Sequence, residues 1–199
     1  MPCMEYAPKL HECFYGPGTV ARPGGTTGMA PRKGAAGNRT EEDFTISWVF
    51  NAPRERLFKA WTDPEELKLW WGPRHFTTPV ARLDLRPGGR YFNCMRGPDG
   101  KDYCSTGTLR EVKAPERLIY TDSFADGKGN RVPPSYYGMD PAWPSEIVVD
   151  VTFEEQPGMA GMSRVTVRLG VPRSIAERQM AAQGWAEMLV KLSEHLEKA

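Results

Sequence analysis

The sequence predicts an α+β fold in which a curved antiparallel sheet wraps around a long C-terminal helix, with two short helices after the first strand. From residue 43 onward, segments with apolar residues at every second position alternate with turns rich in Gly and Pro. From Ser174 to the C-terminus the apolar period changes to 3.6 residues, which is typical of an amphipathic helix. Consecutive strands followed by a separate helix, rather than regular alternation of the two, indicate an α+β domain.

The first strand and the two short helices have clear boundary signals. Apolar side chains occupy every second position of residues 44–50, as expected of a half-buried strand. Pro53 suits a first helical turn, where its missing N–H group would have no partner in any case. Asp63 is expected to cap a second helix that begins at Pro64 and ends before Gly72.

Six further strands are expected over residues 80–86, 90–96, 103–112, 118–124, 147–153 and 165–169. A tight turn at residues 97–100, centred on Asp99, places Cys94 opposite Cys104. Because we expect a reducing compartment, two unlinked thiols that pack as small apolar side chains are favoured for this pair, and a disulfide stays open as the alternative.

Two segments near the C-terminus carry further expectations. Residues 125–144 have no period, yet they contain several large apolar side chains, so we expect an ordered flap that packs on the domain rather than a solvated loop. The final helix, roughly 24 residues from Ser174, would reach about 36 Å and cross the whole sheet. Gly184 in its middle predicts a close approach to a strand or a cavity wall.

Composition limits the domain organisation and the partners. Residues 1–42 are rich in Gly and Pro and predict a disordered tail, for which Met29 is an alternative start, before one domain over residues 43–199. A net charge of +1 without a basic block argues against nucleic acid. The sequence contains no run of the roughly 18 apolar residues that a membrane-spanning helix needs, so we expect a cytoplasmic protein. The four cysteines form no CxxC pair, and neither a metal nor another cofactor is expected.

Several motifs together resemble the START-like (SRPBCC) superfamily, in the branch named after the activator of the heat-shock protein 90 ATPase. The resemblance covers the chain from about Phe44 to the C-terminus and implies the helix-grip (START-like, TBP-like) fold. Trp48 departs from the pattern, since relatives often have Arg there, and so does Asn93, where a large apolar residue is usual. The motifs are APRERLFKAWTDPE, WWGP, RPGG, GPDG, PERL, PSYYGMDPAWP and GW, in chain order, and PSYYGMDPAWP is an insertion.

The resemblance implies a pocket between the sheet and the final helix, which favours the binding of a small hydrophobic or aromatic molecule. Tyr91, Asn93 and Met95 share one strand face, and a buried Asn93 amide would need a partner such as a ligand or an ordered water. The residues expected to line the pocket are Trp70, Trp71, His75, Tyr91, Asn93, Met95, Tyr120, Tyr136, Tyr137, Trp143, Trp185 and Met188.

Two other functions stay open from the sequence. The family name implies a chaperone-associated, protein-binding module, although the eukaryotic relatives carry an additional partner-binding domain. Some START-like relatives are cyclases or hydrolases, and here His75 is only a weak catalytic candidate. An acid and its partner could also come from Asp84 with Arg82 or from Asp122 with Tyr120, or these could be surface pairs. Neither the ligand nor a reaction is named by the sequence, and a homodimer also stays open.

Overall fold

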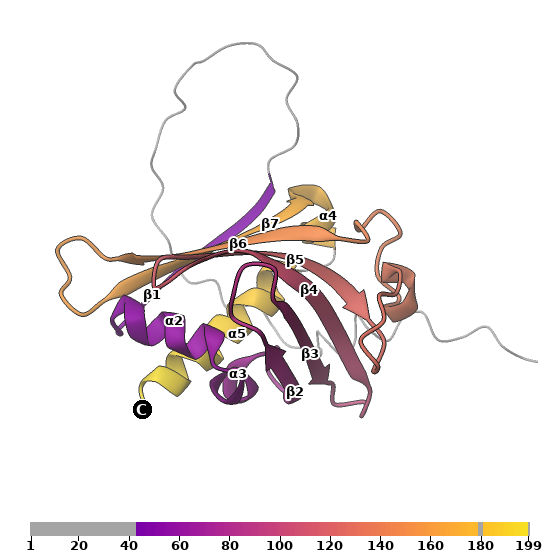
Figure 1. The fold of residues 1–199 in the computed structure, drawn as a ribbon, viewed down its shortest axis with the longest axis horizontal. Helices are drawn as coiled ribbons and strands as arrows, with labels where there is room; N and C mark the ends of the chain where they lie inside the picture. Colours follow the sequence, from indigo (N-terminus) through magenta and orange to yellow (C-terminus); the bar gives the residue numbers. More distant parts are fainter. Residues whose placement is uncertain (1–42, 179–180, 199) are drawn as a thin grey trace, which may run out of the picture.

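A computed structural model of the protein describes residues 43–178 and 181–198, so the predicted N-terminal tail lies outside the described residues. The elements follow one another as expected: a first strand, two short helices, the remaining strands and a helical C-terminus (Figure 1). In chain order they are β1 (Asp43–Phe50), α2 (Arg54–Thr62), α3 (Pro64–Trp70), β2 (Thr77–Leu83), β3 (Arg90–Arg96), β4 (Asp102–Lys113), β5 (Arg117–Ala125), the 3-10 helix η1 (Pro134–Tyr137), β6 (Ile147–Glu155), β7 (Ser163–Pro172), α4 (Arg173–Arg178) and α5 (Ala181–Leu196).

The seven strands form one antiparallel sheet in the order β1-β7-β6-β5-β4-β3-β2, so the first strand pairs with the last. Helices α2, α3 and α5 lie on one face of the curved sheet, which we call the inner face (Figure 1). This arrangement confirms the predicted α+β helix-grip fold. The strand expected from residue 80 begins earlier, at Thr77, and the helical C-terminus is described as α4 and α5.

The predicted start of α3 is confirmed in atomic detail. The Asp63 Oδ1 atom accepts a hydrogen bond of 2.9 Å from the Glu65 N–H group, and Pro64 occupies the first helical position. At the other end of α3, Trp70 is fully buried and its Nε1–H group donates to the Ala60 carbonyl at 2.9 Å. The indole therefore fixes α3 against α2 through both packing and a hydrogen bond.

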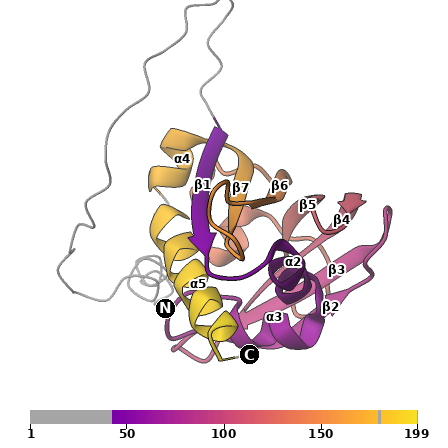
Figure 2. The ribbon, with the colours of Figure 1, turned by 90° about the vertical axis from the view of Figure 1, so that its left-hand side faces the viewer.

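Helix α5 runs beside β1 and contacts α3 (Figure 2). The Lys191 ammonium donates to the carbonyl oxygens of Gly72 at 2.9 Å and of Phe76 at 3.1 Å, which ties α5 to the segment after α3. Burial of this ammonium lowers its pKa. The close approach expected at Gly184 is absent, since an added Cβ atom would meet only the Pro73 Cγ atom at 4.0 Å.

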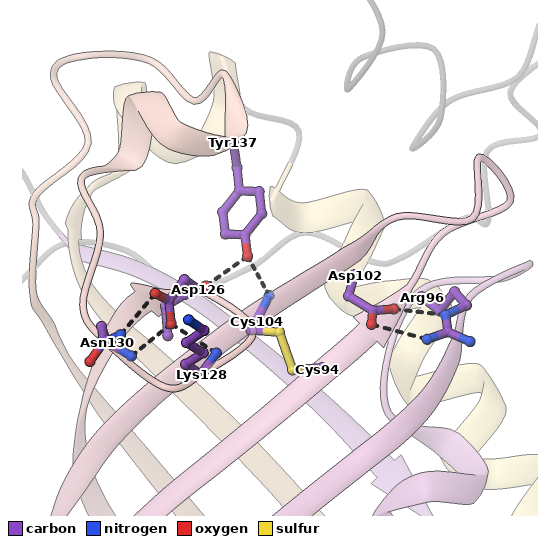
Figure 3. Close-up of a disulfide and its surroundings, with 9 residues drawn as sticks. Cys94, Arg96, Asp102, Cys104, Asp126, Lys128, Asn130 and Tyr137 are labelled. Carbon is purple, nitrogen blue, oxygen red and sulfur yellow. Dashed lines mark hydrogen bonds and ion pairs between the residues drawn. A yellow bond between two sulfur atoms is a disulfide. The ribbon is translucent and has the colours of Figure 1, made fainter.

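The predicted register of the β3–β4 hairpin is confirmed, because Cys94 lies opposite Cys104. The expectation of two free thiols is wrong, since the structure joins them in a disulfide (Figure 3). Both cysteines are buried on the outer face of the sheet, where they form a small second core with Ala125. The prediction depended on the expected compartment, whereas register and burial place the two sulfur atoms side by side.

The segment between β5 and β6 is an ordered flap, as expected, and it contains η1. Its Tyr137 hydroxyl donates to the Ala125 carbonyl at 2.6 Å and accepts from the Cys104 N–H group at 3.0 Å (Figure 3). The hydroxyl thus bridges β5 and β4 at the end of their ladder. Trp143 of the same flap packs, partly buried, against the main core.

We predict that Tyr137→Phe loosens the flap, because it leaves the Cys104 N–H group and the Ala125 carbonyl without their partner. The local cost should be about 1–2 kcal/mol, the usual penalty for unpaired buried groups. Amide hydrogen exchange at Cys104 should then speed up about tenfold. Tyr136→Phe is the matched control, since the Tyr136 side chain is 58% exposed and its loss of a hydroxyl should change nothing. Unchanged exchange at Cys104 in the Tyr137 variant would contradict the bridging role.

Candidate ligand-binding site

A small cavity lies between the inner face of the sheet and the helices. It holds about 60 Å³, which is room for a few water molecules or a comparably small organic group. Strands β2 to β6 supply its floor, and α2, α3 and α5, with the residue after α3, supply its cover. Its lining consists of Trp61, Leu67, Trp71, Leu83, Tyr91, Asn93, Leu109, Leu118, Tyr120, Asp122, Val149 and Trp185.

Three indoles from three different segments form the cover. The rings of Trp61 and Trp185 are stacked, with their centroids 6.3 Å apart and their planes 8° apart. Trp71 stands perpendicular to Trp185 at 5.8 Å and nearly perpendicular to Trp61 at 6.3 Å. Rings packed edge to face in this way are mutually stabilising and rigid. The helices therefore meet through aromatic side chains above the cavity.

The floor carries one hydrogen-bonded polar pair that spans three strands. The Tyr91 hydroxyl of β3 donates to the Asp122 carboxyl of β5, although β4 lies between them. Gly107 of β4 is the register partner of Tyr91. A Cβ atom at Gly107 would lie 2.7 Å from the Tyr91 ring and 1.7 Å from the Thr121 carbonyl oxygen. Only glycine leaves space for the tyrosine to cross β4 and reach the carboxyl.

Burial governs the ionisation of this pair. It raises the pKa of the Asp122 carboxyl, while hydrogen bonds from Tyr91 and Ser105 oppose the increase. Burial and the neighbouring Asp122 raise the pKa of the Tyr91 hydroxyl well above its usual value. The pKa of the Tyr120 hydroxyl is raised for the same two reasons. The hydroxyls are thus neutral near pH 7, and Asp122 is the one cavity group whose charge changes within the acidic range.

A second polar group in the lining is incompletely paired. The Asn93 side chain is only 7% exposed, and its Oδ1 atom has no hydrogen-bond partner among the described residues. Buried polar groups are nearly always paired, so this oxygen calls for a guest molecule or an ordered water in the cavity. The sequence leads to the same expectation for this amide.

The structure brings five of the twelve predicted lining residues to the cavity, namely Trp71, Tyr91, Asn93, Tyr120 and Trp185. The other seven lie elsewhere. Trp70 and Met188 are buried in the main core, Trp143 packs against it, and Met95 lies beside Gly72. His75 and Tyr136 are exposed, and Tyr137 holds the flap to the sheet.

Sequence reasoning missed several lining residues. It pairs Asp122 with Tyr120 as one of two acid candidates, whereas the hydrogen-bond partner of Asp122 is Tyr91. It does not single out Trp61, because helical spacing does not separate core from cavity wall. The period of two in β5 is a usable signal, since it places Asp122 on the same face as Tyr120 and Leu118.

A larger open groove of about 800 Å³ lies at the other end of β5 and β6. Its walls carry both signs of charge, and these side chains pair with one another, as Arg54 does with Glu116 and Glu155. Solvated, mutually neutralised charges of this kind give little binding energy. The smaller aromatic cavity is therefore the better candidate.

Within residues 43–178 and 181–198, no helix combines the length and the apolar character needed to cross a membrane. Over the same residues, no cluster of three or more His, Cys, Asp or Glu side chains is arranged to hold a metal ion.

We predict that Asp122→Asn stabilises the protein at neutral pH. The pKa of Asp122 in the folded protein is raised above its ordinary value of 3.8, so the unfolded chain ionises first as the pH rises. The wild type therefore loses stability relative to the variant from about pH 4 up to the folded pKa, and the difference is constant above it. The gain should be on the order of 1 kcal/mol, the usual scale for a change at one buried polar group.

Urea unfolding of both proteins between pH 3 and pH 8 measures this difference. Asp150→Asn is the matched control on the outer face, where the carboxylate accepts bonds of 2.9 and 2.7 Å from Arg117. That variant should be destabilised at neutral pH. A destabilised Asp122 variant at pH 7 would show that the carboxylate is paired rather than desolvated.

Comparisons with known proteins agree with this architecture. A solved structure from Mycobacterium smegmatis is 28% identical, with a TM-score of 0.61 over 77% of this chain and 87% of its own. One from Chromobacterium violaceum is 27% identical, with a TM-score of 0.62 over 78% of this chain and 97% of its own. One from Nitrosomonas europaea, at 23% identity, shows the fold alone, with a TM-score of 0.65 over 81% of this chain and 97% of its own.

The search among curated proteins gave no match. A family description, in contrast, matches residues 51–197, which include every element from α2 to α5. This match confirms the START-like resemblance read from the sequence motifs. The chain belongs to the family described as Activator of Hsp90 ATPase homolog 1-like protein.

Proposed function

We propose that this protein binds a small organic molecule in the cavity between the inner face of the sheet and α5. The family and the fold support a START-like ligand-binding domain in general. The observation that carries the proposal for this chain is the unpaired Oδ1 atom of Asn93 in a lining otherwise made largely of apolar and aromatic side chains. Small-molecule sites typically combine an apolar wall with a few polar groups that orient the ligand.

The size of the cavity sets the size of the ligand. A volume of about 60 Å³ accepts a group of a few heavy atoms without rearrangement. Trp71 and Trp185 are both only partly buried, so the aromatic cover retains a route towards solvent. A ligand with a compact head in the cavity and a body along these indoles fits this geometry.

The chaperone alternative gains no specific support, and the enzyme alternative retains only the pair of Asp122 and Tyr120, which both line the cavity. A proton-transfer catalyst would have to lie in the cavity lining. His75 is exposed and is not among the lining residues. A chaperone partner and a homodimer stay predictions, since among the described residues no surface feature identifies either one.

We predict that Leu83→Trp blocks binding by filling part of the cavity that Leu83 lines. Leu83 ends β2 and is partly exposed, so a larger side chain there should not overpack the main core. Phenol, indole, benzyl alcohol and benzylamine serve as probes, and the quenching of tryptophan fluorescence measures their binding. The dissociation constant of any probe that binds the wild type should increase more than tenfold.

The matched control is Leu85→Trp. Leu85 is 40% exposed and lies two residues beyond Leu83, outside the cavity lining. This variant should bind each probe as the wild type does and should show the same melting temperature. Equal binding by the Leu83 variant would place the ligand elsewhere, and failure of all four probes to bind the wild type would count against the proposed function.

A further inference from the structure

The cavity contains a carboxyl group without a basic partner. Among the described residues that line it, none is a lysine, an arginine or a histidine. The hydrogen bonds that the Asp122 carboxyl receives come from Tyr91, Ser105 and the backbone of Ser123, all of which are neutral groups. Asp122 is half-buried, and an ionised carboxylate largely withdrawn from water without a cation is costly, so proteins usually pair such groups. The described residues of the lining therefore leave this carboxyl without the positive charge that would pair with it.

The groups around this carboxyl are aromatic rather than aliphatic. Tyr91 and Tyr120 lie edge to face beside it, with ring centroids 5.4 Å apart. The indoles of Trp61, Trp71 and Trp185 complete the cover on the opposite side. The face of an aromatic ring carries negative electrostatic potential, and indole attracts a cation most strongly of the three aromatic side chains. Walls of this kind around one carboxyl recognise an alkylated ammonium group better than a neutral one.

The polar atoms of the lining favour the same kind of guest. The Asn93 Oδ1 atom is an unpaired acceptor, and an ionised Asp122 is acceptor-only. The Tyr91 hydroxyl is already engaged, since it donates a hydrogen bond to the Asp122 carboxyl. A ligand that brings a positive charge or N–H donors satisfies these oxygens, whereas a carboxylate or phosphate would be repelled.

We propose that the ligand of this cavity is an organic cation, with the Asp122 carboxylate as its counter-ion and the surrounding aromatic rings as its walls. This assignment rests on the proposed function, because it names the ligand class of the same cavity. Lys191, the partly buried cation of α5, cannot take the place of the ligand, since its ammonium is bonded to the carbonyls of Gly72 and Phe76.

Cation binding should depend on pH through Asp122. The titratable groups that face this carboxyl are Tyr91 from β3 and Tyr120 from β5, and both are neutral across the acidic range. The residues that α2, α3 and α5 add to the lining carry no charge. Since burial raises the carboxyl's pKa, a bound cation must displace its proton at low pH. Affinity should therefore rise about tenfold per pH unit below this pKa and stay constant above it.

The experiment compares cations with neutral molecules of the same shape. Tetramethylammonium and tert-butyl alcohol form the smaller pair, and trimethylphenylammonium and tert-butylbenzene form the larger pair. Neither cation titrates, so any pH dependence belongs to the protein. Tryptophan fluorescence, checked by calorimetry, gives the dissociation constants of the wild type, of Asp122→Asn and of Asp150→Asn. The last variant removes one negative charge from the outer face and controls for the overall charge.

The expected result is at least tenfold tighter binding of each cation than of its neutral counterpart. This preference should disappear in Asp122→Asn, persist in Asp150→Asn and decline as the pH falls. Equal or tighter binding of the neutral molecules to the wild type would overturn the cation assignment and leave the proposed function standing. A cation preference that survives in Asp122→Asn would overturn the role of this carboxylate. Failure of all four molecules to bind would overturn both proposals.

Discussion

The packing of α5 against the indoles of Trp61 and Trp71 determines how much space remains between this helix and the sheet. Trp61 stacks on Trp185, and Trp71 stands against both rings, so the helix cannot approach the sheet more closely at this point. Lys191, further along the same helix, holds it to the backbone after α3. The aromatic contacts keep the helix at a distance from the sheet, and the hydrogen bonds of the ammonium hold it in place. The cavity exists because these two constraints fix one distance between the helix and the sheet.

The two halves of the sheet differ in the side chains that their inner faces present to the helices. On β6 and β7 the buried inner side chains are aliphatic or aromatic except for Ser163 at the start of β7, and Val151, Phe153 and Val167 are at most 1% exposed. That half forms a continuous core with α2 and with the inner face of β1. On β3 and β5 the inner face carries Asn93 and Asp122 instead, which cannot pack into a dry core without a penalty. The cavity thus lies where the inner face of β3 and β5 carries Asn93 and Asp122.

Much of the fold could be predicted from the sequence, because the decisive signals are local. The alternation in β1, the proline and aspartate at the start of α3 and the turn before Cys104 each involve neighbouring residues. The site was harder to predict, because it depends on contacts between distant strands. The pair of Tyr91 with Asp122 requires the order β3-β4-β5 and a glycine at position 107, neither of which a single strand reveals. The same difference explains why Trp70 is expected in the pocket. Spacing shows that a side chain faces inward, but not whether it meets another side chain or an empty volume.

Within the cavity lining, two polar groups lack the protein partners that the structural polar groups have, although the buried Ser123 and Ser163 hydroxyls outside the lining are also unpaired among the described residues. Tyr137, Lys191 and Trp70 each satisfy backbone groups that would otherwise be buried without hydrogen bonds. Asn93 retains an unpaired oxygen, and Asp122 is held by neutral groups in a lining without a basic residue. A fold selected for stability alone would place apolar residues at these two positions. Their retention inside an aromatic cavity is explained when a ligand supplies the missing donor and the missing charge.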